Sequence, residues 1–158
     1  MKKSVLILLT FIPIIVGYIV NFTIRIPVIG MMIFYALPLL TTLFWFYLGR
    51  QYARSLWKTV PAILIGNATG VVSLLVYLWQ FLLETDETRN LTLAGASQMF
   101  SASAPTYLLA RLAIFFEEQP NYTGRTSMVA LQVVSVVYMI MVFCIAVFWE
   151  KKKQIGDS

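Results

Sequence analysis

Long apolar runs alternate with short polar segments along most of this chain. Four runs stand out by their length, and they cover residues 4–24, 28–49, 59–83 and 127–149. Each has about the 20 residues with which an α-helix crosses the hydrocarbon core of a bilayer, and a helix satisfies its own backbone hydrogen bonds there. The pattern therefore predicts an all-α integral membrane protein with four transmembrane helices, organised as a single membrane domain over residues 1–158.

The first two runs are separated only by Arg25, Ile26 and Pro27. Proline has no backbone N–H to donate, and it disfavours helical geometry in the residue before it. The two predicted helices are therefore expected to form a tight antiparallel hairpin.

Basic residues lie at the ends of the apolar runs and gather at three places, residues 2–3, 50–58 and 151–153. Short loops rich in Lys and Arg stay on the cytoplasmic side of a membrane. With four spans, all three places fall on the same side. We therefore expect both the N and the C terminus in the cytoplasm, the connecting segment 84–126 on the outer side, and a multi-pass location in a bacterial cell membrane.

The composition agrees with a membrane protein. Hydrophobic residues make up 59% of the chain and charged residues 12%, whereas soluble domains carry about 25% charged residues. The formal net charge of +5 at pH 7 comes from lysines and arginines that flank apolar runs, which is typical of membrane anchors. The bilayer is therefore the expected surrounding, and no nucleic acid is expected as a partner.

Tryptophan side chains favour the interface between lipid and water. On that basis Trp45, Trp57 and Trp149 are expected near the inner interface, and Trp79 near the outer one. The tail that follows, residues 150–158, is interpreted as a short solvated end.

The segment 93–116 is long enough to span, but it contains Arg111, and an arginine near the centre of a spanning helix costs about 2.5–3.5 kcal/mol. A fifth span would also place the lysine-rich C-terminal end on the outer side, against the charge rule.

Two other interpretations of this segment stay open. Ser103 as an N-cap, followed by Pro105, predicts an outer interfacial helix. Alternatively, the Ala- and Ser-rich residues 95–104 form a re-entrant stretch covered by protein.

Small residues recur every four positions in the third run. Ala62, Gly66 and Gly70, with Ser73 beside them, form a small-residue ridge that lets another helix approach closely. One interpretation is dimerisation or contact with a partner protein. Packing within the same bundle is the favoured alternative, because Gly-x-x-x-Gly is a common pattern.

Three amide side chains lie within the predicted spans. Asn67 adjoins the small-residue ridge and should face protein, either in a hydrogen bond between helices or in contact with a solute. Gln80 and Gln132 lie near the outer ends of their spans, where interfacial water is within reach, and both are interpreted as structural.

The outer segment offers a second polar focus. Arg111, Glu117 and Glu118 fall on one face of the predicted interfacial helix. They form either a functional cluster or an ordinary solvated face, and the spacing of oxygen ligands in known calcium loops is absent.

Several chemistries are disfavoured by residue type. The chain has one cysteine, Cys144, and no histidine, so a thiol relay, haem ligation, catalytic zinc and a histidine base all lack their usual residues. Motifs for a serine nucleophile, a phosphate-binding loop and a zinc protease are also missing from the sequence. We expect no cofactor and no metal ion.

Three hypotheses for function remain. The first is a non-enzymatic accessory, regulatory or immunity-type protein, which acts through helix–helix contacts at the small-residue ridge and through the outer segment, with another membrane protein or a second copy of itself as partner. The second is a small-solute permease or channel component lined by Asn67 and the re-entrant stretch. The third is a membrane enzyme that acts on a lipid or isoprenoid with Arg111, Glu117 and Glu118.

Overall fold

The computed structural model describes residues 2–55, 57–109 and 124–156, and within these ranges every regular element is a helix. The elements are α1 (Lys3–Leu9), α2 (Ile12–Thr23), α3 (Ile29–Arg54), α4 (Thr59–Leu78), the π-helix η1 (Trp79–Leu83), α5 (Leu91–Ala102), the 3-10 helix η2 (Pro105–Leu109) and α7 (Arg125–Gly156).

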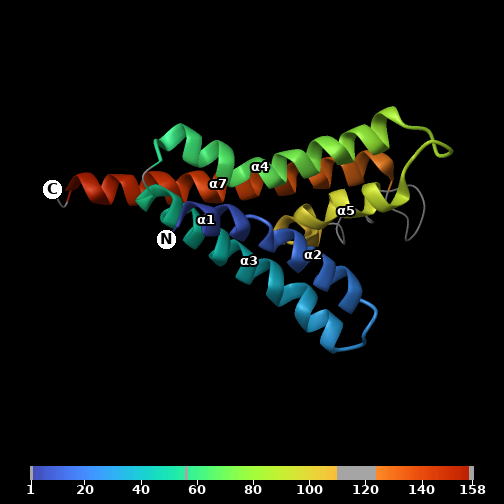
Figure 1. Cartoon of the computed structure of the whole chain (residues 1–158). Helices are drawn as coiled ribbons and strands as arrows, with labels where there is room; N and C mark the ends of the chain where they lie inside the picture. Colours follow the sequence, from blue (N-terminus) through green and yellow to red (C-terminus); the bar gives the residue numbers. More distant parts are fainter. Residues whose placement is uncertain (1, 56, 110–123, 157–158) are drawn as a thin grey trace.

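Four helical stretches are long and apolar enough to cross a membrane, and this confirms the prediction of four spans by length and composition. They are Lys3–Thr23, Ile29–Arg54, Thr59–Leu83 and Arg125–Gly156. Both termini lie at one end of the molecule, which we call the terminal end (Figure 1). The opposite end, where α4 runs into residues 84–90, is called the loop end.

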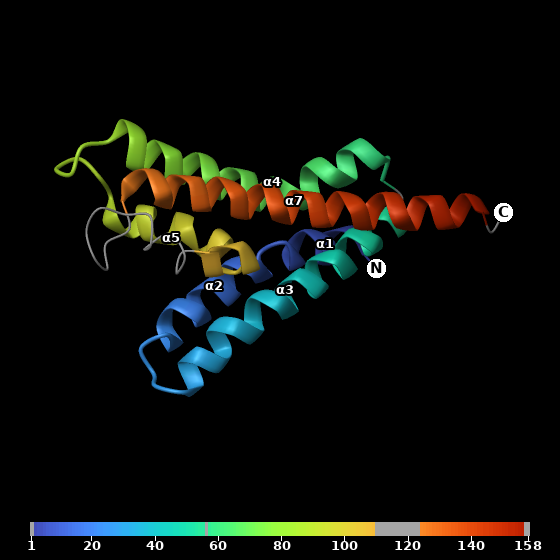
Figure 2. The same ribbon diagram turned by 180° about the vertical axis from the view of Figure 1, so that it is seen from behind.

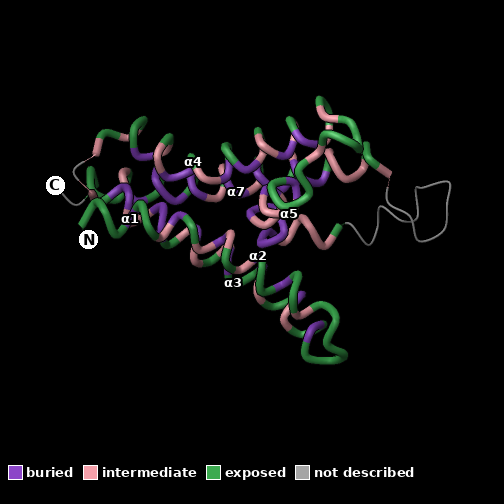
Figure 3. The backbone as a smooth tube through the Cα atoms, turned by 45° about the vertical axis from the view of Figure 1, so that its right-hand side comes forward, coloured by how far each residue is buried: buried purple, intermediate pink, exposed green. Residues whose placement is uncertain are grey.

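α3 packs extensively on α7, and toward the loop end the helices diverge as two pairs (Figure 1). α4 and α7 lie side by side, while the hairpin of α2 and α3 leans away from them toward the loop end (Figures 1 and 2). The tip of this hairpin is mostly exposed (Figure 3), as expected for a surface in lipid. α5 lies in the wedge between the pairs, where it packs on α2 and α4.

The first span is interrupted, whereas the sequence predicts one continuous helix over 4–24. α1 ends at Leu9 and α2 begins at Ile12, because Pro13 donates no hydrogen bond and its ring crowds the preceding turn. The carbonyl oxygen of Thr10 accepts a hydrogen bond of 3.0 Å from the hydroxyl of Thr69 on α4 instead. A side chain from a neighbouring span therefore satisfies backbone that the break leaves free, as lipid requires.

The segment after the third span corrects one prediction. Ser103 is not the N-cap of an interfacial helix but the C-cap of α5, which begins much earlier. The side chain of Asn90 caps α5 by accepting a hydrogen bond from the Leu93 amide. α5 enters the bundle and buries Phe100 and Ser101, so its position corresponds to the re-entrant interpretation. The continuation of the predicted interfacial helix lies largely outside the described residues.

Two glycines make room for α5. A Cβ placed on Gly17 of α2 would overlap the backbone carbonyl of Met99, and a Cβ on Gly70 of α4 would overlap the ring of Phe100. The backbones of α2 and α5 are therefore in direct contact. α5 lies between α2 and α4, and each of these helices has a glycine at its closest approach to α5. Close contact of this kind supplies the packing attraction that holds helices together in lipid.

A row of aromatic rings fills the centre of the bundle. Trp45 lies edge-on to Phe100, with ring centroids 5.6 Å apart, and 5.5 Å from Phe143. Phe143 contacts Tyr52 at 5.3 Å, and Tyr52 contacts Trp57 at 5.5 Å. We call these five residues the aromatic ladder. Trp45 is 0% exposed, because it packs against Phe100 of α5 and Phe143 of α7 in the core of the bundle.

The terminal end is closed by a charged cluster around Glu150, the first residue of the predicted solvated tail, whereas residues 152–156 are exposed as predicted. α7 continues as a helix to Gly156, and the side chain of Glu150 is only 4% exposed. Its carboxylate accepts hydrogen bonds from the Nε atoms of Arg50, at 2.7 Å, and Arg54, at 2.6 Å. The two arginines are one turn apart on α3 and so share a face, which lets one carboxylate join α3 to α7.

The Gly17→Ala variant tests the role of the close contact between α2 and α5. The new Cβ forces α5 away from α2, and overpacking of this kind costs about 1–3 kcal/mol of the free energy of unfolding. The measurement is equilibrium unfolding by SDS titration in mixed micelles.

Gly95→Ala is the matched control, because nothing lies within 4 Å of a Cβ at this position of α5. It should leave the free energy of unfolding unchanged or raise it by about 0.5–1 kcal/mol through helix propensity. Equal losses in both variants would show that α5 is not held by contact with α2.

Candidate functional site at the loop end

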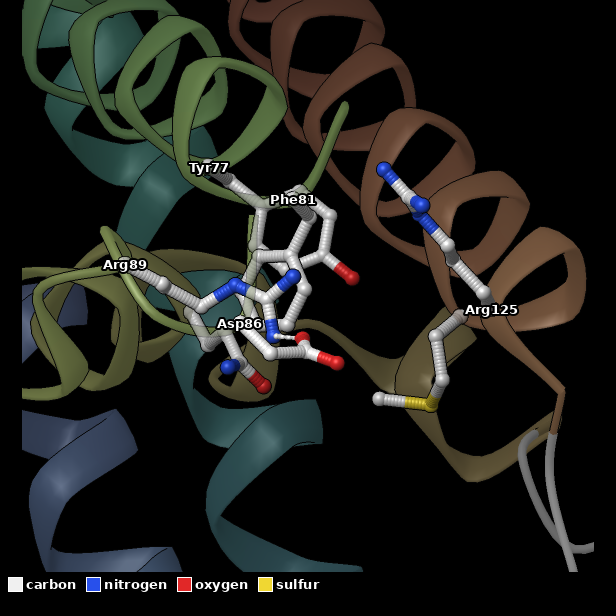
Figure 4. Close-up of a pocket in the computed structure, with 7 residues that line it drawn as sticks. Tyr77, Phe81, Asp86, Arg89 and Arg125 are labelled. Carbon is white, nitrogen blue, oxygen red and sulfur yellow. Dashed lines mark ion pairs between the residues drawn. The ribbon is translucent and has the colours of Figure 1, made fainter. Parts of the chain in front are cut away.

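A pocket of about 380 Å³ opens at the loop end, between the end of α4, the start of α7 and α5. We call it the loop-end pocket (Figure 4). Its lining residues are Tyr77, Phe81, Asp86, Arg89, Gln98, Arg125 and Met128. They come from four segments, so the pocket exists only in the folded bundle.

One wall of the pocket is a pair of stacked aromatic rings. Tyr77 and Phe81 lie four positions apart, with ring centroids 4.4 Å apart and an interplanar angle of 29°. Phe81 belongs to the π-helical turn that ends the third span. Single π turns are frequent at functional sites, because the wider turn changes the direction of side chains and frees backbone groups.

Arg89 is held over this wall by three contacts. Its Nε donates a hydrogen bond of 2.9 Å to the backbone carbonyl of Gln80, which lies in the π turn where carbonyls lose their helical partners. Its Nη1 lies 2.8 Å from Asp86, and its guanidinium carbon lies 4.8 Å from the centre of the Phe81 ring. The cation therefore has a defined position, while no described residue bonds its Nη2.

The connection between α4 and α5 is also locked by hydrogen bonds. The side-chain oxygen of Gln80 accepts a bond of 2.9 Å from the Asn90 amide, and the Asn90 side chain in turn caps α5. Gln80 is buried by this folding back of the loop. Its expected contact with interfacial water is therefore replaced by contact with protein.

Arg125 faces the pocket from the opposite side, where α7 begins (Figure 4). Its side chain is exposed, and no carboxylate in the described part of the chain pairs with it. The lining thus holds two guanidinium groups against one carboxylate, Asp86, whose side chain is 92% exposed. The N-terminal end of α7 adds partial positive charge beside Arg125, while Glu84 and Glu87 add negative charge to the 84–90 loop outside the lining.

The protein beneath the pocket is polar. Gln132 lies one turn deeper on α7 than Met128, which lines the pocket, and residues four apart share a helix face. Gln132 is 0% exposed, and neither its nitrogen nor its oxygen has a hydrogen-bond partner among the described residues. Buried amides of this kind are costly and normally paired. Gln132 does not itself line the pocket, so a ligand would reach it only by entering one turn deeper along α7 than Met128.

The small-residue ridge is used inside the bundle. Ala62, Gly66, Gly70 and Ser73 are all buried, and a Cβ on Gly66 would overlap the ring of Phe143, as one on Gly70 would overlap Phe100. The geometry is that of packing within one chain, and none of these residues lines the loop-end pocket.

Of the two polar sites predicted from the sequence, the structure describes only the one at Asn67. Asn67 is buried, and its Nδ2 donates to the Ile63 carbonyl at 2.9 Å, while its Oδ1 has no partner among the described residues. Arg111, Glu117 and Glu118 lie outside the described residues.

Sequence reasoning missed the loop-end pocket. From the sequence, Arg89 and Arg125 are only two charged residues of the predicted outer segment, because a linear pattern does not show that they lie on facing walls of one pocket. The Tyr77 and Phe81 pair, four positions apart beside an arginine-bearing loop, was the available signal. It was not separable from ordinary apolar spacing in a spanning helix.

Comparison with known proteins adds no assignment to the geometry. No protein-family model matches the chain, and neither a curated protein nor a solved structure is similar to it. Within the described ranges, no three side chains among His, Cys, Asp and Glu gather as a metal-binding set. The function must therefore be argued from the loop-end pocket itself.

Asn90→Ala tests whether the helix cap organises the pocket. Loss of the side-chain acceptor should cost about 0.5–2 kcal/mol and should speed amide hydrogen exchange in the first turn of α5. Asn90→Asp keeps the acceptor and serves as the control, with exchange close to that of the unaltered protein. Equal exchange in the Ala and Asp variants would contradict a capping role.

Proposed function

We propose that this chain is a multi-pass protein of a bacterial cell membrane, with both termini in the cytoplasm and a non-enzymatic accessory, regulatory or immunity-type role. It acts by binding at the loop end, which faces outward. The orientation is supported by the basic residues 2–3, 58 and 151–153, all belonging to segments at the terminal end (Figure 1), because such residues favour the cytoplasmic side.

The observation that carries the proposal is the loop-end pocket with its pre-positioned arginine. Arg89 is held by a carbonyl, a carboxylate and an aromatic face before any ligand arrives. Groups held in place by their surroundings bind without a large ordering cost. A formed recess that presents two guanidinium groups on a helical scaffold is suited to recognition.

The small-residue ridge takes a different part in this proposal from the one first expected. Phe143 and Phe100 occupy the space over Gly66 and Gly70, so the helix–helix contacts of the ridge belong to the bundle itself. We assign contact with a partner, another membrane protein or a second copy of this chain, to the loop end.

A single labelling experiment tests both the orientation and the contact. A Cys144→Ala background receives one new cysteine, by Glu87→Cys at the loop end or Lys152→Cys at the terminal end, both exposed positions. Intact cells are treated with a membrane-impermeant, thiol-reactive photo-crosslinker. We expect labelling and a discrete crosslinked protein only for Glu87→Cys.

Arg25→Cys is the matched control, since it is exposed at the loop end but lies in the turn between α2 and α3. It should be labelled without forming the same crosslink. Labelling of Lys152→Cys alone would reverse the orientation, and identical crosslinks from Glu87→Cys and Arg25→Cys would refute a specific contact at the 84–90 loop.

A second candidate function, a small-solute permease or channel component, is favoured by one observation. Two buried amides on different spans, Asn67 and Gln132, have atoms without partners among the described residues, and α5 enters the bundle near them. Helical segments that end inside a membrane bundle are known in channels and transporters.

Flux into liposomes tests this second candidate. Asn67→Leu and Gln132→Leu should each lower the uptake of glycerol or lactate without loss of folded protein. Thr42→Val is the control, because that hydroxyl bonds only the Pro38 carbonyl of its own helix. Uptake no faster than in protein-free liposomes would eliminate the candidate.

A further inference from the structure

We propose that the loop-end pocket binds a phosphate group, held between Arg125 and Arg89 with the polar end of the ligand directed toward Gln132. The inference rests on the proposed function and names the ligand class of the same site. Its three supports are the arginine donors that no described residue uses, the polar residues beneath the pocket, and the position of the pocket at the end of the third span.

The two arginines supply donors suited to an oxyanion. Among the described residues, Arg89 contacts the Gln80 carbonyl through Nε and Asp86 through Nη1, and the two N–H groups of Nη2 have no partner there. Arg125 faces it across the pocket with no paired carboxylate among the described residues (Figure 4). Guanidinium groups bind phosphate oxygens through paired, charge-assisted hydrogen bonds.

Gln132 determines which end of the ligand enters. Gln132 lies one turn below the lining, and its amide atoms have no partner among the described residues. A phosphate ester or hydroxyl that enters one turn deeper can bond them, whereas an apolar chain cannot. Below Tyr77, the next residue on the same face of α4 is Ser73, which is also buried. The ligand therefore enters with its polar group first.

The position of the pocket favours a phospholipid headgroup as the source of the phosphate. Phe81 lies in the last turn of the third candidate span, and a span ends where the headgroups begin. Trp79 and Leu83, on the same π turn, are exposed, so acyl chains can run along their surface while the phosphate enters the pocket. A free phosphate compound has the same chemistry and is separated by experiment.

The test uses the purified full chain in a neutral detergent and follows thermal unfolding. Phosphatidylglycerol should raise the unfolding temperature in a saturable way, and phosphatidylcholine, whose headgroup is neutral overall, should do so much less. Arg125→Gln should weaken the apparent affinity for phosphatidylglycerol by about tenfold, as expected for the loss of a charge-assisted pair. Because Arg125 is exposed, this variant keeps the fold.

Arg25→Gln is the matched control, with the same change of charge at the same end of the molecule but outside the loop-end pocket. Its affinity for phosphatidylglycerol should stay within twofold of the unaltered protein. Equal weakening in Arg25→Gln and Arg125→Gln would reduce the effect to general surface charge and overturn the proposal.

Gln132→Leu separates ligand contact from a structural role. Removing an unpaired buried amide should leave the unfolding temperature of the lipid-free protein the same or higher, while the affinity for phosphatidylglycerol falls several-fold. Unchanged affinity in this variant would contradict entry of the polar end toward Gln132.

Inorganic phosphate distinguishes the two sources. If millimolar phosphate displaces phosphatidylglycerol and itself stabilises the protein, the site recognises phosphate as such; if only the lipid stabilises it, the headgroup is the ligand. Stabilisation by neither overturns the inference. Since no partner protein is present, that failure leaves the crosslinking result of the proposed function standing, and the two can be told apart.

Discussion

The direct contact between the backbones of α2 and α5 at Gly17 is the constraint on which the rest of the structure depends. Any side chain there would overlap the Met99 carbonyl, and α5 would no longer fit between the diverging helix pairs. With α5 in place, Phe100 reaches Trp45 and completes the aromatic ladder. With α5 in this position, the 84–90 loop folds back to join it to the third span, and Arg89 in that loop bonds the Gln80 carbonyl at the end of the span.

Polar groups inside the bundle divide into those that support the fold and those available for function. The Thr69 hydroxyl satisfies the broken first span, and Glu150 joins Arg50 and Arg54 at the terminal end. These groups have partners and act as structural bonds between spans. Gln132 has none among the described residues, and in a surrounding without water such an amide is costly, so its position beneath the loop-end pocket is the clearest physical argument for a ligand.

The two ends of the molecule use charge in different ways. At the terminal end, the cluster around Glu150 joins α3 to α7, and the lysines at 151–153 follow it on α7. At the loop end, Arg89 and Arg125 stand on facing walls of a recess (Figure 4). The first arrangement joins two helices of the bundle, while the second presents hydrogen-bond donors to a pocket.

The sequence by itself determined the four spans, the tight turn after Thr23 and the close packing capacity of Gly66 and Gly70. These features depend on run length, proline chemistry and residue size, which are local properties. The sequence analysis predicted one continuous helix over residues 4–24 and missed the break before Pro13, although a proline inside a helix is a known cause of such breaks.

Only the tertiary structure decided that α5 enters the bundle, that Trp45 lies in the core, and that Arg89 and Arg125 share a pocket. The physical reason is that lipid and protein interior are both apolar, so hydropathy does not distinguish a helix face turned to lipid from one turned to another helix. Which faces meet depends on contacts between residues far apart in the chain, and in this protein those contacts also form the candidate site.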